Sequence, residues 1–151
     1  MNKQSPLKVV GISTRTRNEI GKPNIEIMNL WAKFMTKNLS EQIKNKVSNN
    51  IYSIYTDYES NFMGEYTVLL GFAVDDLNDV PPGLVGREFP EAQFKVVPAK
   101  GAIPDAVIQT WIDIWNKDFT LNRAYNYDFE LYTENSQKGD QSVVDIYLSV
   151  R

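Results

Sequence analysis

The stretch Asp128-Phe129-Glu130 repeats, with one aromatic residue exchanged, the earlier stretch Asp57-Tyr58-Glu59. Each stretch falls in the third element of a strand–helix–strand–strand series that the hydrophobic pattern predicts for its half of the chain. Self-similarity of this kind indicates an internal duplication. We therefore expect one domain over residues 1–151, built from two like units at about residues 7–75 and 84–150.

The predicted elements follow the same order in both halves. The first half contains a strand over 7–17, a helix that begins at Asn24 and ends by Asn38, a short helical turn over 40–46, and strands over 51–58 and 65–74. A polar connector with two prolines follows over 75–83. The second half contains a strand over 93–97, a helix opened by Ile103-Pro104-Asp105, and strands over 123–133 and 141–150. Each helix carries tryptophan on its apolar face: Trp31 in the first, Trp111 and Trp115 in the second.

This pattern predicts an α+β fold. Two strand–helix–strand–strand units would form a mixed, mostly antiparallel sheet with two main helices on one face. A groove is expected where the pseudo-symmetric halves meet, and such junctions are favoured sites for small ligands.

The composition excludes several kinds of chemistry. The chain has 151 residues, a formal net charge of −3, no cysteine and no histidine. Disulfides, thiolate or imidazole metal sites, cysteine nucleophiles and serine–histidine triads are therefore impossible. No glycine-rich phosphate loop is present, and Asp75, Asp76 and Asp79 lack the spacing of a calcium loop. We expect no metal, no cofactor and no catalytic residue set of these kinds.

The same data bear on location and partners. The longest apolar run, Val68–Val74, is far too short to span a membrane, and no signal peptide pattern opens the chain. We expect a cytoplasmic protein, without membrane attachment, that is a monomer or weak dimer. The mild negative charge argues against direct nucleic-acid binding.

Strand 127–132 carries the residues that suggest a site. Alternation places Asp128, Glu130 and Tyr132 on one face, while Tyr127, Phe129 and Leu131 on the other are apolar enough to pack on the helices. Aromatic residues make up 12% of the chain. A carboxylate among aromatic rings would suit a lipophilic cation, through charge and cation–π attraction. The alternatives are an exposed strand carboxylate, tryptophans that pack the core, and tyrosines that pack across strands.

Five segments, in order along the chain, carry a resemblance to a known family. They are Val9-Val10-Gly11-Ile12, Leu30-Trp31-Ala32-Lys33-Phe34, Tyr52 to Ser60, Gly64-Glu65-Tyr66-Thr67 and Asp128 to Tyr132. Together they resemble the effector-binding domains of AraC-type and multidrug-responsive regulators, also called gyrase-inhibitor-like domains. The stand-alone, integron-associated subgroup is the most similar.

The resemblance implies two pseudo-symmetric repeats and small, hydrophobic, often cationic ligands. It implies that Glu130 lies in the ligand pocket and that Trp111 forms part of its wall. The further wall positions Tyr55, Tyr66 and Tyr147 rest on strand-face arguments. Regulators of this family carry a helix-turn-helix domain ahead of this one, but only six residues precede the first predicted strand here. We therefore do not expect direct transcriptional control by this chain.

Three functions remain open from the sequence. The first is a stand-alone sensor or sequestering protein that binds lipophilic, cationic compounds. The second is a hydrolase of reactive small molecules, with Glu130 as general base and a tyrosine hydroxyl polarising the leaving group. The third is a module that binds a larger protein.

Overall fold

The computed structural model describes residues 2–4, 6–19 and 24–151. Its helices are α1 (Ile25–Thr36), α2 (Leu39–Gln42) and α3 (Asp105–Asn116). Its strands are β1 (Asn2–Gln4), β2 (Leu7–Arg17), β3 (Lys46–Thr56), β4 (Glu65–Val74), β5 (Val85–Phe89), β6 (Ala92–Lys100), β7 (Tyr127–Tyr132) and β8 (Val143–Ser149). Short 3₁₀ turns lie at Asp118–Thr120, Glu134–Gln137 and Gly139–Gln141.

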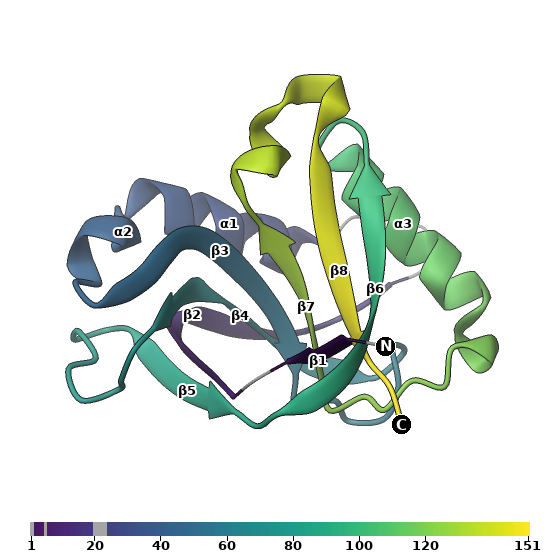
Figure 1. Ribbon diagram of the computed structural model, residues 1–151, viewed down its shortest axis with the longest axis horizontal. Helices are drawn as coiled ribbons and strands as arrows, with labels where there is room; N and C mark the ends of the chain where they lie inside the picture. The colour runs from purple at the N-terminus through teal and green to yellow at the C-terminus, as the bar shows by residue number, and fades with distance from the viewer. Residues whose placement is uncertain (1, 5, 20–23) are drawn as a thin grey trace.

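The strands form one sheet in the order β1-β6-β8-β7-β3-β4-β2-β5, and neighbouring strands are antiparallel. The first unit contributes β2-α1-β3-β4 and the second β6-α3-β7-β8. Their strands occupy mirrored places, so that β3 and β7 pair at the centre (Figure 1). The α+β fold of two strand–helix–strand–strand units is confirmed. The sequence pattern did not predict the two edge strands, β1 and β5.

The two main helices are built alike. Each has 12 residues, with tryptophan six positions after the first residue, at Trp31 in α1 and Trp111 in α3. The predicted cap is present, because Asn24 Oδ1 accepts a hydrogen bond of 3.0 Å from the backbone N–H of Ile27. In Figure 1, α1 lies beside the β2–β4 half and α3 beside β6 and β8. Within the described residues, no helix is long and apolar enough to cross a membrane.

Both faces of the sheet are buried, one against the helices and the other within the curl of the sheet itself. Phe89 on β5 and Phe94 on β6 come from opposite ends of the strand order, yet both ring centroids lie within 5.3 Å of that of Tyr127. The sheet therefore bends round and encloses a second core. This core holds Leu7, Val9, Ile54, Leu69, Ala73, Phe89, Phe94, Tyr127 and Phe129.

This curl corrects the predicted orientation of β7. We expected Tyr127 and Phe129 to pack on the helices, but both belong to the core inside the curl. Glu130, on the other face, receives a hydrogen bond from Trp111 of α3. Apolar alternation showed which residues share a face, but two buried faces cannot be told apart by polarity alone.

The repeated Asp–aromatic–Glu stretch is not a structural repeat. Asp128 and Glu130 lie within β7, whereas β3 ends at Thr56, so Asp57 and Glu59 fall in the hairpin turn and are exposed. Asp57 has a φ of 51°, a left-handed conformation that aspartate tolerates better than most residues. The matching face expected for Tyr55, Asp57 and Glu59 therefore includes only Tyr55.

The enclosed core yields a stability prediction. Phe94 is fully buried and contacts the rings of Tyr127, Phe129 and Tyr147, so Phe94→Ala should lower the free energy of unfolding by about 3–5 kcal/mol. Phe119→Ala is the matched control, because Phe119 is 89% exposed and its loss should change stability by less than about 0.5 kcal/mol. Denaturant unfolding measures both. Equal effects would show that the sheet does not close over Phe94.

Candidate functional site

Glu130 is a carboxylate held almost entirely out of water. It is 2% exposed and points to the helix-covered face of β7. Its Oε2 accepts hydrogen bonds of 2.7 Å from the Tyr55 hydroxyl and 2.7 Å from the indole Nε1 of Trp111. Its Oε1 accepts one of 2.5 Å from the Tyr132 hydroxyl. Three donors converge on this one group, and a carboxylate in its ionised form can accept all three hydrogen bonds.

The donors come from both units of the fold. Tyr55 lies on β3, directly opposite Asp128 in the β3–β7 register, and its ring centroid is 5.5 Å from that of Trp111. Tyr132 lies two residues beyond Glu130, and its ring centroid is 4.9 Å from that of Trp31 on α1. The equivalent tryptophans of the two helices therefore each pack against a tyrosine that donates to Glu130.

Burial dominates the protonation of this group. Burial raises the pKa of Glu130 above its ordinary value, while the hydrogen bonds from Tyr132, Tyr55 and Trp111 lower it by less. Burial, followed by the charge of Glu130, also holds the pKa of the Tyr55 and Tyr132 hydroxyls well above the usual tyrosine value. Both tyrosines therefore stay protonated and remain donors at neutral pH.

Asp128 lies two residues before Glu130 on the same face of β7, but its carboxylate is paired with a positively charged side chain. It is fully buried, and its Oδ2 lies 2.7 Å from Nη2 of Arg123, which is 3% exposed. Tyr58 also donates to Oδ2, and the backbone N–H and hydroxyl of Ser149 donate to Oδ1 at 2.7 and 3.1 Å. Asp128 thus has a permanent cation as partner.

Arg123 also reaches out of the core. Its Nη1 lies 2.7 Å from the partly exposed carboxylate of Asp118, and its guanidinium carbon is 4.4 Å from the ring centroid of Tyr125 and 6.0 Å from that of Trp111. Burial lowers the pKa of Arg123, but Asp128 and the neighbouring tyrosines outweigh it, so that the pKa is raised overall. The arginine stays charged.

Glu130 has no cation as partner within the part of the chain that the structure describes. Among residues 6–19 and 24–151, whose side chains the structure describes, the buried charged residues are Arg123, Asp128 and Glu130. The ion pairs of this set join Arg123 to Asp128 and Asp118, and none reaches Glu130. The carboxylate of Glu130 is therefore solvated by hydrogen bonds but not neutralised by a charge.

The predicted site residues divide into three groups. Glu130, Trp111 and Tyr55 are in direct contact. Tyr66 lies one ring away, with its centroid 5.8 Å from that of Tyr55 and its hydroxyl donating to Asn18. Tyr147 is not part of this group, because it stacks on Phe129 at 4.5 Å on the opposite face of the sheet.

Sequence reasoning missed some of the residues around the carboxylate. Tyr132 was placed on the correct face of the strand but was not proposed as a donor. The packing of Trp31 against Tyr132 follows from the shared position of the two helix tryptophans, a signal that the sequence does contain. For Arg123, which was read as the start of a strand, no sequence signal pointed to a buried ion pair.

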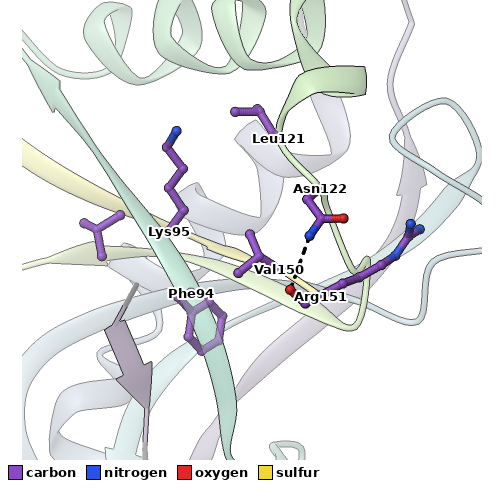
Figure 2. A pocket seen from close by; sticks show the side chains of 7 residues that line it. Phe94, Lys95, Leu121, Asn122, Val150 and Arg151 are labelled. Carbon is purple, nitrogen blue, oxygen red and sulfur yellow. Dashed lines mark hydrogen bonds between the residues drawn. The ribbon is translucent and has the colours of Figure 1, made fainter.

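Two open hollows lie away from this site. One of about 480 Å³ is lined by Phe94, Lys95, Val96, Leu121, Asn122, Val150 and Arg151, and its rim carries the hydrogen bond from Asn122 to the Arg151 carbonyl (Figure 2). The other, of about 320 Å³, lies around Lys100 and Gln141. Neither is lined by Glu130, whose oxygens are covered by their own donors.

Comparison with known proteins shows the family of the chain and its fold. The family of integron-associated effector binding proteins matches residues 3–150. The chain belongs to this family. YobU of Bacillus subtilis (strain 168) is 28% identical over 151 residues, covering 95% of this chain and 92% of its own.

Solved structures of other proteins have the same fold as this chain. The integron cassette protein VCH_CASS2, from the mobile metagenome of Vibrio cholerae, has a TM-score of 0.75 at 27% identity, covering 99% of this chain and 94% of its own. SAV2435, solved bound to tetraphenylphosphonium, has a TM-score of 0.80 at 18% identity, covering 99% and 92%. This chain is thus an integron-associated effector binding protein by family and has the fold of these solved structures.

The buried carboxylate gives a pH prediction for the ligand-free protein. Because the folded pKa of Glu130 is raised, its contribution to stability is fully present below the unfolded pKa and is lost as pH rises through the folded pKa. The stability of the wild type minus that of Glu130→Gln should therefore fall with rising pH. Denaturant unfolding over roughly pH 4 to 8 measures the difference.

Glu59→Gln serves as the control for this series, since it removes the same charge from an exposed position. A wild-type advantage that instead grows with pH would mean that the fold favours the ionised carboxylate, contrary to the dominance of burial.

Proposed function

We propose that this effector-binding protein captures small lipophilic cations at Glu130, as a stand-alone sensor or sequestering protein. The observation that carries the proposal is the buried carboxylate of Glu130, which has three hydrogen-bond donors and, among the described side chains, no cation. Attraction between opposite charges grows as water is excluded, so a cation brought to this carboxylate would gain more than at the surface.

The rings around Glu130 suit an organic cation better than a hydrated metal ion. Tyr55, Trp111, Tyr132 and Trp31 surround the group and offer cation–π attraction of about 0.5–2 kcal/mol per ring. An organic cation with a diffuse charge loses little hydration on entry and gains contact with the ring faces. A site for an organic cation is expected to combine a carboxylate with aromatic rings, whereas a metal site would need several oxygen ligands close together.

Apolar side chains on the helices continue the site outwards. Met28 and Met35 lie three residues before and four after Trp31, on the same side of α1, and are 57% and 68% exposed. Ile108 stands in the same relation to Trp111 on α3 and is 55% exposed. These side chains, next to the half-buried tryptophans, provide a lipophilic approach, and flexible methionines adapt to ligands of different shape.

Entry requires a change in the side chains that cover the carboxylate. Trp111 and Tyr132 are only partly buried, so the ligand's route passes them, whereas Tyr55 is held inside the core. In this proposal the ligand displaces the indole N–H or the Tyr132 hydroxyl from Glu130 and puts its charge in place of that donor. The cation-bound relative SAV2435, of the same fold, supports this class of ligand.

Ligand-induced stabilisation tests the proposal. Tetraphenylphosphonium at 100 times its Kd should raise the free energy of unfolding of the wild type by about 2.7 kcal/mol. Glu130→Gln keeps the size of the side chain but removes its charge, so most of this stabilisation should disappear. Thermal-shift and calorimetric titrations measure the effect, and mass spectrometry of the recovered compound separates capture from hydrolysis.

Glu59→Gln is the matched control, an exposed glutamate changed in the same way. It should retain the full ligand-induced shift. Equal shifts in both variants would remove Glu130 from the site, and no shift in the wild type with any lipophilic cation would reject the proposal.

Proton linkage gives a second test. Burial raises the pKa of Glu130, and a bound cation would lower it, so binding releases a proton wherever the free site is protonated. Affinity should therefore tighten with rising pH, by up to about tenfold per pH unit, and level off above the folded pKa. Calorimetry in buffers of different ionisation enthalpy measures the released proton. Triphenylphosphine oxide, an uncharged analogue, should show no such slope, and a pH-independent cation affinity would contradict the mechanism.

A further inference from the structure

We propose that Arg123 determines how many positive charges the Glu130 site accepts: by pairing with Asp128, it leaves Glu130 as the one buried carboxylate without a cation among the described side chains, and makes the site selective for singly over doubly charged cations. The inference rests on the proposed function, since it concerns which ligands that site takes. It comes from a difference between two carboxylates on the same face of β7: Asp128 pairs with an arginine, whereas Glu130 accepts hydrogen bonds from neutral donors.

Asp128 and Glu130 are close enough for both to act on a ligand. They are two residues apart on the same face of β7, a separation of about 6.6 Å along the strand. Tyr55 lies opposite Asp128 in the strand register and donates its hydroxyl to Glu130, so the same side chain borders both groups. A ligand with two charges about this far apart would span the pair if both carboxylates were available.

Asp128 is not available. Its Oδ2 receives Arg123 and the Tyr58 hydroxyl, and its Oδ1 receives the N–H and hydroxyl of Ser149. The ion pair of 2.7 Å cancels its charge inside the core, where both side chains are at most 2% exposed. The second carboxylate contributes structure but no net attraction for a ligand.

Arg123 also acts on the ligand site directly through Trp111. The indole N–H of Trp111 donates to Glu130, while the guanidinium carbon of Arg123 lies 6.0 Å from the centroid of the same ring. Within the described part of the chain, the buried Nε of Arg123 has no hydrogen-bond partner, so the guanidinium has one unused donor on this side. A donor group that carries a positive charge offers nothing to a second cation. A second ligand charge near Trp111 would meet repulsion from Arg123.

The test compares two cations of equal shape. Methyl viologen carries two charges, and its isostere with one N-methylpyridinium ring replaced by p-tolyl carries one. The wild type should bind the monocation at least about tenfold more tightly, because placing like charges together in a desolvated site costs more than a factor of ten in affinity. A dication is also harder to desolvate, so the decisive comparison is among Arg123 variants.

Two variants isolate the charge of Asp128. Arg123→Gln leaves Asp128 as a second uncompensated carboxylate, so the preference for the monocation should shrink by at least about tenfold. Arg123→Gln combined with Asp128→Asn removes the same arginine but also the second negative charge. Most of the wild-type preference should therefore return, without the part that comes from direct repulsion by Arg123. Tryptophan fluorescence and calorimetry measure both ligands on each variant, after denaturant unfolding has confirmed that each is folded.

The outcomes separate this inference from the proposed function. The role of Arg123 is overturned if Arg123→Gln keeps the wild-type preference for the monocation. It is also overturned if the double variant loses as much of that preference as Arg123→Gln does. In both cases the Glu130-dependent binding stands. Failure of both cations to bind the wild type rejects the proposed function itself. If Arg123→Gln does not fold, Asp128→Asn alone removes the buried partner of Arg123 and leaves it paired, among the described residues, only with the partly exposed Asp118. Monocation binding should then weaken by at least about tenfold, and an unchanged Kd overturns the inference.

Discussion

A buried carboxylate that finds no counter-ion among the described residues is the constraint on which the site depends. Glu130 gathers the hydroxyls of Tyr55 and Tyr132 and the indole of Trp111 because a buried acceptor left without donors would be costly. Those donors come from the central strands of both units and from α3. The same hydrogen bonds that solvate the carboxylate therefore hold the junction of the two halves together. In the proposed mode of binding, a ligand that displaces one of them would act on the centre of the fold.

The duplicated architecture explains why such a group sits at the centre. The mirrored strand order puts β3 and β7 side by side, and the equivalent helices bring Trp31 and Trp111 to the same central strands. The curl of the sheet fills the opposite face with Phe94, Tyr127 and Phe129, so stability on that side does not depend on the site. The helix-covered face can then carry a polar group that a single-core domain of this size would tolerate less well.

The sequence predicted the units of the fold better than their orientation. β2 and β4 were predicted with their observed bounds, because long alternating or apolar runs end at clear breakers. The faces of β7 were assigned the wrong way round, since Tyr127 and Phe129 are as apolar as a helix-packed face but lie inside the curl. Tyr147 was grouped with Glu130, although β8 places it opposite Phe129.

The Arg123–Asp128 pair shows why other parts of the site escaped prediction. Positive φ values at Asn122 and Tyr125 bend the chain on both sides of Arg123 and let its side chain turn back into the core. Neither residue is a glycine, the usual sequence signal of such a conformation. The choice of Asp128 over Glu130 as the partner of Arg123 thus depends on backbone turns that the residue pattern does not reveal.

In the proposed function, the donors of Glu130 determine how strongly its carboxylate attracts a cationic ligand. With fewer donors, burial would raise the pKa further, and a proton would compete with the cation for the carboxylate. If an arginine replaced one of the donors, as Arg123 does at Asp128, it would neutralise the charge of Glu130. A cationic ligand would then gain little binding energy from the carboxylate. Three neutral donors hold Glu130 between these limits: they solvate a carboxylate in the core and leave its charge for a cation to neutralise.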